Sequence, residues 1–153
     1  LDTFKGVAGV LFPFLAKAIA ALPLAADLFS ATSANDASVA RIIKGTGSSL
    51  PLEDLEFYRR LVASRVHVNS TLQMMAQWKL EPLLERLPKI AAPTLLIAAD
   101  RDTAVPPATS EKAAARMPTA RFQLLKGLGH LAHEEDANAV AQLILHDLEN
   151  LST

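Results

Sequence analysis

The chain has 153 residues, a length typical of one domain, and its 50% hydrophobic and 20% charged residues argue against intrinsic disorder. Fifteen lysines and arginines against sixteen aspartates and glutamates give a net charge of −1, so we expect no nucleic-acid partner. The absence of cysteine excludes disulfide scaffolds, zinc ribbons, iron–sulfur clusters and thiol catalysis.

The first part of the chain, up to about residue 90, has the apolar spacing of helices. Residues 6–21 are mostly apolar but are interrupted by Pro13 and Lys17, so no transmembrane helix is predicted there. Because Lys5 and Lys17 flank the uncharged part of this stretch, residues 6–16, peripheral contact with a membrane surface is an alternative to packing inside the protein.

Further helices are predicted over residues 36–44, from Pro51 to Val62, over residues 67–79 and over residues 80–87. Residues 45–49, with the sequence GTGSS, form a loop between the first two of these helices. On the helix at residues 67–79, Met75 and Trp78 are candidates for lining an apolar pocket that accepts a flat macrocycle. The alternative for both side chains is ordinary packing between helices.

From Pro93 onward the pattern changes to that of an α/β protein. Residues 94–99 form a continuous apolar run, as in a strand buried on both faces of a parallel sheet. A helix at about residues 108–116, a strand at residues 121–125 and a final helix from about Asp136 follow. This order predicts two parallel strands joined by a helical crossover. Two strands are too few for a stable parallel sheet, so we expect the chain to be a fragment from the end of a larger one.

Candidate chemistry lies after each predicted strand. Asp102, in the motif D-x-x-V-P, follows the first strand, and His130, in the motif G-x-G-H, follows the second. Parallel neighbours bring these two loops to the same edge of the sheet, where the carboxylate can accept a proton from one ring nitrogen and leave the other as a base. Taken alone, an aspartate at the position of Asp102 is more often a turn former or helix cap, and a histidine at the position of His130 is more often structural or merely exposed. Their order within one strand–helix–strand–helix pattern favours a functional pair.

These motifs resemble the C-terminal part of the α/β-hydrolase superfamily, in which the triad follows the order Ser, Asp or Glu, His. The resemblance implies that residues 1–90 form a helical cap and residues 91–153 the end of the hydrolase core. It also implies that Asp102 is the acid and His130 the base, while Asp100 is not catalytic. The motif G-x-S-x-G does not occur, and no strand precedes Ser48, so the serine nucleophile is expected upstream and this chain alone is expected to be inactive.

His133 raises a further alternative, because His130 and His133 form an H-x-x-H pair. No predicted helix carries the two histidines, and no third metal ligand is apparent in the sequence. Neither a metal nor any other cofactor is therefore expected. His133 instead belongs to a polar stretch that leads into the last helix, and it is a weaker site candidate than His130.

A closer resemblance covers nearly the whole chain and is to the family of magnesium-chelatase accessory proteins of bacteriochlorophyll synthesis. The segments that carry it are GTGS (residues 45–48), LEFYRRLV (55–62), MMAQWKLEPLL (74–84) and GLGHLAHEE (127–135). One departure is Ala137, where relatives often have proline. The resemblance implies a protein of photosynthetic tetrapyrrole metabolism, located in the cytoplasm or at a membrane surface. Its expected partners are a small hydrophobic or tetrapyrrole substrate and magnesium chelatase.

Three functions remain open from the sequence. The first is a serine-type hydrolase acting on an ester or related acyl bond. The second is a non-catalytic accessory protein that keeps the fold to bind a tetrapyrrole or the chelatase. The third is a helical interaction module in which the Asp102–His130 pairing is incidental.

Overall fold

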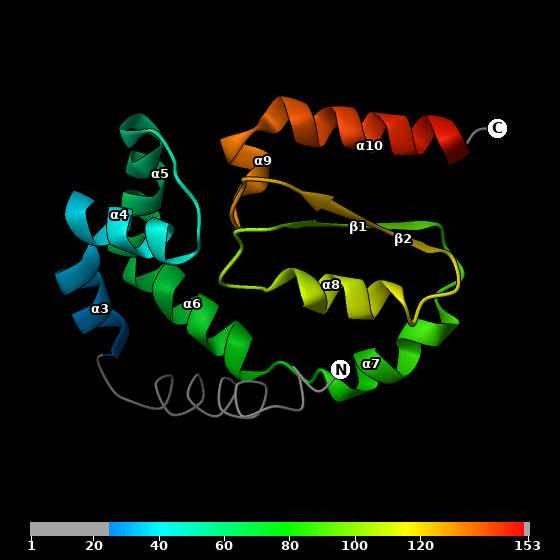
Figure 1. Ribbon diagram of the computed structural model, residues 1–153. Coiled ribbons are helices and arrows are strands. Elements are labelled where there is room, and N and C mark those ends of the chain that lie inside the picture. The colour runs from blue at the N-terminus through cyan, green and yellow to red at the C-terminus, as the bar shows by residue number, and fades with distance from the viewer. Residues whose placement is uncertain (1–24, 152–153) are drawn as a thin grey trace. The chain divides into compact units, whose positions relative to one another are not determined.

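A computed structural model describes residues 25–151, so the candidate membrane-contacting stretch at residues 6–21 lies outside the described part (Figure 1). The described residues form two compact units, one made of residues 25–42 and 51–81 and the other of residues 43–50 and 82–151. Between residues 25 and 151, no helix has both the length and the apolar character needed to cross a bilayer. The expected roles of residues 1–90 as cap and 91–153 as core stay predictions.

The first unit is helical, as its apolar spacing predicted. Helices α3 (Ala25–Ser33), α5 (Leu52–Ala63) and α6 (Arg65–Ala76) pack on one another. Their buried contacts include Ala26, Leu55 and Val68. Helix α4 (Asp36–Gly45) begins after Asn35, whose Oδ1 accepts a hydrogen bond from the Ser38 amide at 2.9 Å, as expected of a helix cap.

Helix α6 differs from the predicted helix at residues 67–79 at both ends. It begins at Arg65 because Ser64 caps it, with Oγ accepting from the His67 amide at 3.2 Å. It ends at Ala76, where the amides of Gln77 and Trp78 turn back to the carbonyls of Met74 and Met75. Trp78 therefore lies beyond the helix. Helix α7 (Glu81–Arg86) and a short 3₁₀ helix (Leu87–Lys89) replace the predicted helix at residues 80–87.

The second unit contains the predicted parallel strand pair. Strands β1 (Thr94–Ala99) and β2 (Ala120–Leu125) are paired in parallel, from Thr94 opposite Ala120 to Ala99 opposite Leu125. Helix α8 (Pro107–Ala114) joins them and packs against both, while helices α9 (Ala132–Glu135) and α10 (Ala137–Leu151) follow β2 (Figure 1). An ion pair of 2.8 Å between Arg121 and Asp147 connects β2 to α10.

Burial of β1 is less complete than its apolar sequence predicted. Only Ala98 and Ala99 are buried, and the other four residues of the strand are half-buried. An apolar strand of this kind is usually buried in the middle of a sheet, with a strand on each edge. In the described part of the chain, β1 has such a neighbour on one edge only.

Candidate active site

Asp102 and His130 meet where the two strands end, as their positions after neighbouring parallel strands predicted. Nδ1 of His130 lies 2.9 Å from Oδ2 of Asp102. The Asp102 side chain is 9% exposed and that of His130 is 39% exposed, so the carboxylate is shielded while the ring reaches solvent. An ionised carboxylate only accepts hydrogen bonds, so Nδ1 donates, and in the neutral form of the ring Nε2 then carries the lone pair. This arrangement makes Nε2 available as a base.

The second oxygen of Asp102 shapes its own loop. Oδ1 accepts hydrogen bonds from the backbone amides of Ala104 at 2.9 Å and Val105 at 2.8 Å. Asp102 therefore does both things that its position in the sequence suggested: Oδ1 forms the turn, and Oδ2 pairs with His130. Three N–H donors stabilise the carboxylate charge and fix its orientation toward the ring.

Asp100, two residues earlier, has a different part in the same region. Its Oδ1 accepts from the Gly127 amide at 2.7 Å, and its Oδ2 lies 3.8 Å from Nζ of Lys126. The amide of Arg101 donates to the carbonyl of Leu128 at 2.9 Å. These contacts join the loop after β1 to the loop after β2, and both carboxylate oxygens of Asp100 have partners other than His130.

A third segment, residues 45–48, contacts both loops of the candidate site. The Thr103 amide donates to the Thr46 carbonyl at 3.2 Å, and Thr103 Oγ1 donates to the Gly45 carbonyl at 2.7 Å. On the other side, Ser48 Oγ accepts from the Leu131 amide at 2.8 Å. We did not predict these contacts from the sequence, in which the only signal was the two glycines of the loop.

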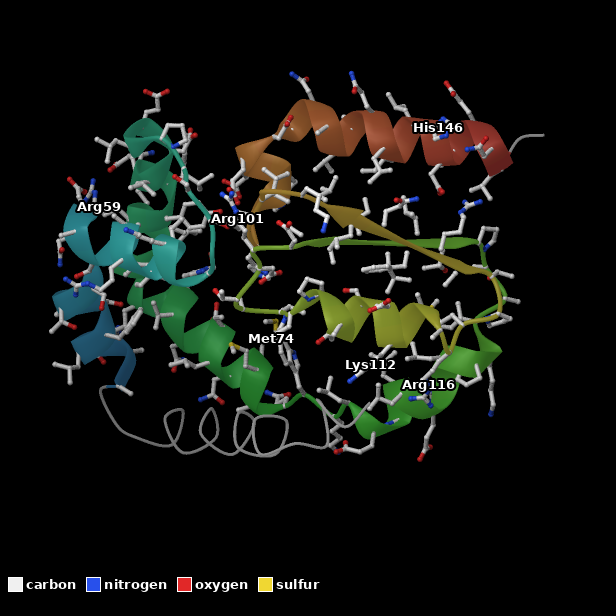
Figure 2. All side chains as sticks on the ribbon, in the orientation of Figure 1. Arg59, Met74, Arg101, Lys112, Arg116 and His146 are labelled. Atoms are coloured by element: carbon white, nitrogen blue, oxygen red, sulfur yellow. The ribbon has the colours of Figure 1, made fainter. Side chains whose placement is uncertain are left out.

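Two glycines permit this close approach. Gly47 has a φ of +85°, and a Cβ there would collide with the backbone carbonyl of Arg101, a residue labelled in Figure 2. A Cβ at Gly129 would collide with the carbonyl group of Gly47 and the amide nitrogen of Ser48. Glycine is therefore required at both positions by contact between backbones.

A cavity of about 170 Å³ borders the Asp102–His130 pair. It is lined by Ile97, Ala98, Ala99, Asp102, Gly129, His130, Ala132, His133 and Val140. His133 thus faces the same cavity as His130, and its Nε2 lies 3.5 Å from Oε1 of Glu134. Among the described residues, no three His, Asp or Glu side chains are grouped as a metal site would require.

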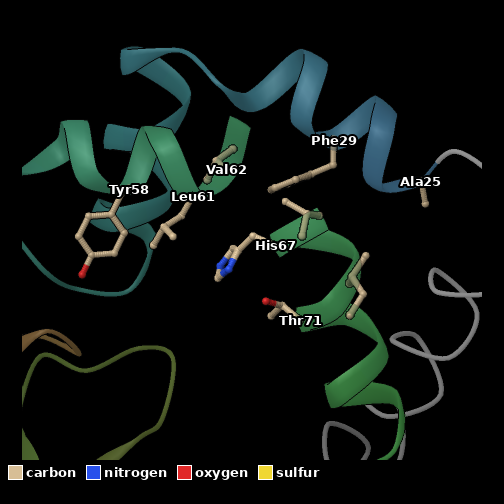
Figure 3. Close-up of a pocket in the computed structure, with 9 residues that line it drawn as sticks. Ala25, Phe29, Tyr58, Leu61, Val62, His67 and Thr71 are labelled. Carbon is tan, nitrogen blue, oxygen red and sulfur yellow. The ribbon is translucent and has the colours of Figure 1, made fainter. Parts of the chain in front are cut away.

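A larger cavity, of about 480 Å³, belongs to the first unit (Figure 3). Its lining is mostly apolar and comprises Ala25, Phe29, Tyr58, Leu61, Val62, His67, Val68, Thr71 and Leu72. The two sequence-predicted substrate contacts do not line it, since Met75 is half-buried elsewhere on α6 and Trp78 is 46% exposed. The cavity-lining residues were missed because helical spacing alone does not separate packing from pocket positions.

Comparison with known proteins decides the family. Residues 3–143 match the family described as "Alpha/beta hydrolase family". The chain belongs to the α/β-hydrolase family. This α/β-hydrolase chain is 42% identical over 149 residues to the "Magnesium-chelatase 30 kDa subunit" of Rhodobacter capsulatus, covering 97% of this chain and 52% of that protein. Its fold is similar to that in "Structure of MenH from S. aureus", with a TM-score of 0.65 and 19% identity over 94% of this chain and 53% of the other.

The comparisons confirm the predicted α/β-hydrolase fold and the resemblance to a magnesium-chelatase subunit. The chain spans about half the length of the relative and of the solved structure that it matches. Family membership does not itself assign a reaction, because unrelated functions share this fold.

Proposed function

We propose that this α/β-hydrolase chain supplies the acid, Asp102, and the base, His130, of a Ser-Asp-His triad. The serine would come from an earlier part of the natural full-length protein. The observation that carries the proposal is the 2.9 Å contact between Nδ1 of His130 and Oδ2 of Asp102. The chain order of the two residues is that of the family's triad.

In the proposed reaction, Nε2 of His130 takes the proton from the serine hydroxyl as the serine oxygen attacks the carbonyl carbon of an ester. Asp102 stabilises the imidazolium that forms. The imidazolium then gives its proton to the leaving alcohol as the ester C–O bond breaks and an acyl-serine remains. His130 next takes a proton from water, which attacks the acyl-serine, and returning that proton to the serine oxygen releases the acid.

Three observations support a nucleophile located outside these 153 residues. The sequence has no G-x-S-x-G motif. In the described part, one edge of β1 has no strand neighbour, and the cavity beside His130 is lined by Ile97, Ala98 and Ala99 of β1. The matched relative is about twice as long as this chain. Further strands beyond the free edge of β1, one of them ending in the serine turn, would complete both the sheet and the triad.

A serine-reactive phosphonate probe tests this proposal on the full-length protein. We expect the wild type to be labelled at a serine and an Asp102→Asn variant to be labelled about 10⁴-fold more slowly. The asparagine oxygen still accepts from Ala104 and Val105, but its amide donates toward Nδ1 and fixes the wrong tautomer. The measurement is the labelling rate, followed by mass spectrometry.

Asp100→Asn is the matched control, because Asp100 lies in the same loop but contacts Gly127 and Lys126 instead of His130. It should be labelled within a few-fold of the wild-type rate. Equal labelling of the Asp102→Asn variant and the wild type, or no labelling of the wild type, would refute the triad.

A second candidate function is that of a non-catalytic accessory protein in photosynthetic tetrapyrrole synthesis. The identity to a relative named as a magnesium-chelatase subunit favours it, as does the apolar cavity of about 480 Å³. Pockets of this size hold small organic ligands. In this proposal the cavity binds the apolar face of a tetrapyrrole, and the imidazole of His67, which lines the cavity, contacts the polar part of the ligand. Met75 and Trp78 would contact the ligand outside the cavity. Magnesium chelatase would be the protein partner.

Titration of the full-length protein with a magnesium porphyrin, followed by absorbance, tests this second function. We expect saturable binding that Leu61→Asp weakens at least tenfold, because Leu61 lines the cavity and a carboxylate there would lose its hydration when the apolar face of the ligand covers it. Leu52→Asp is the matched control on the same helix, since Leu52 is 82% exposed and does not line the cavity. Equal affinity of the two variants would exclude this cavity as the binding site.

A further inference from the structure

We infer that the loop of residues 45–48 positions the acid–base pair, with Ser48 as the positioning residue for His130. This inference rests on the proposed role of Asp102 and His130 as a working pair. It assigns a role to a segment that is distant in sequence from both residues and that contains neither of them.

The first step of the argument concerns the base. Ser48 Oγ accepts from the backbone amide of Leu131, the residue that follows His130, at 2.8 Å. Ser48 is only 3% exposed, so water does not readily replace this hydrogen bond. The direction in which the backbone leaves His130 is therefore set by a side chain from another loop. Rotation of that backbone would carry the imidazole away from Asp102.

The second step concerns the acid. Thr103, the residue that follows Asp102, donates its amide to Thr46 and its hydroxyl to Gly45. One short stretch of chain therefore holds the residue after the acid and the residue after the base. Because the same stretch makes both contacts, it sets the spacing between the two loops, which the 2.9 Å hydrogen bond between Asp102 and His130 requires.

The third step is the absence of side chains where the three segments cross. Gly47 and Gly129 bring the backbone of residues 45–48 against both loops, and a Cβ at either glycine would displace one of them. Such direct backbone contact leaves little freedom for the loops to shift independently. A merely structural loop would stabilise the fold without controlling the orientation of the His130 ring.

A loop that positions the His130 ring can be distinguished from one that only stabilises the fold by the ¹⁵N chemical shifts of that ring. They are measured in the full-length protein at a pH where the imidazole is neutral. In the wild type we expect Nδ1 to be protonated and Nε2 bare. In Ser48→Ala the two shifts should move toward each other as both tautomers become populated. Labelling by the phosphonate should become about 10- to 100-fold slower. Ser48→Thr, which keeps the hydroxyl, should restore much of both signals.

Ser49→Ala is the matched control, because Ser49 is exposed and adjacent to Ser48. Unchanged shifts in a folded Ser48→Ala variant would overturn the positioning role and leave the proposed triad standing. Altered shifts in a protein whose wild type is never labelled would support the positioning role and reject the hydrolase function. Should Ser48→Ala fail to fold, Thr103→Val removes the hydroxyl contact to Gly45 instead, and unchanged His130 shifts in that variant would equally overturn the inference.

Discussion

His130→Ala in the full-length protein should lower kcat for ester hydrolysis by about 10⁶-fold, the largest effect expected of any substitution in this chain. The reason is that Nε2 of His130 is the group proposed to accept the serine proton, and alanine removes it. Stability should change little, because the His130 side chain is 39% exposed and its one described side-chain partner is Asp102. The measurement is steady-state hydrolysis of a chromogenic ester.

His133→Ala provides the control for this substitution. His133 lines the same cavity, but its described side-chain contact is with Glu134. Its loss should change kcat by no more than a few-fold. If His133→Ala instead removed activity and His130→Ala did not, the base would be misassigned.

Gly47→Ala should destabilise the folded protein by about 2–5 kcal/mol. Alanine disfavours the φ of +85° at this position by about 1–2 kcal/mol, and displacement of the Arg101 carbonyl adds the cost of overpacking, about 1–3 kcal/mol. The measurement is the free energy of unfolding from denaturant titration.

Gly45→Ala is the matched control, two residues away. A Cβ there meets nothing within 4 Å, and the residue lies in the last turn of α4, so the change should be neutral or stabilising by up to about 1 kcal/mol. Equal stability of the two variants would mean that residues 45–48 are not held against the loop after β1.

The strands and the pairing of Asp102 with His130 could be predicted because their signals are local. An apolar run bounded by Pro93 and Asp100 predicted β1, and parallel order then placed the two following loops together. The helical ends were less predictable, because the Ser64 cap that starts α6 at Arg65 depends on one side-chain hydrogen bond. Trp78 was assigned to this helix from apolar spacing that continues beyond the point where the helix ends.

The contribution of Ser48 could not be predicted from the sequence. From the sequence, Ser48 is a candidate only for a nucleophile, and the lack of a preceding strand argues against that role. Its observed contact is to a backbone amide, and backbone amides give no sequence signal. The positive φ of Gly47 was equally hidden, since glycine adopts many conformations and the need for it arises from Arg101 on another loop.

The contacts of residues 45–48 also bear on how the site assembles during folding, because they join segments that are far apart in the chain. Ser48 and Leu131 are 83 positions apart in the chain, and Gly45 and Thr103 are 58 apart, whereas Asp102 and His130 are separated by 28. Closing the longer loops costs more chain entropy, so the strand–helix–strand unit can form before residues 45–48 pack against it. On the ribosome, residues 45–48 emerge before either partner loop and are available when those loops appear. In refolding from denaturant, all segments are present from the start. Residues 45–48 then have to contact both loops in a chain that is already collapsing.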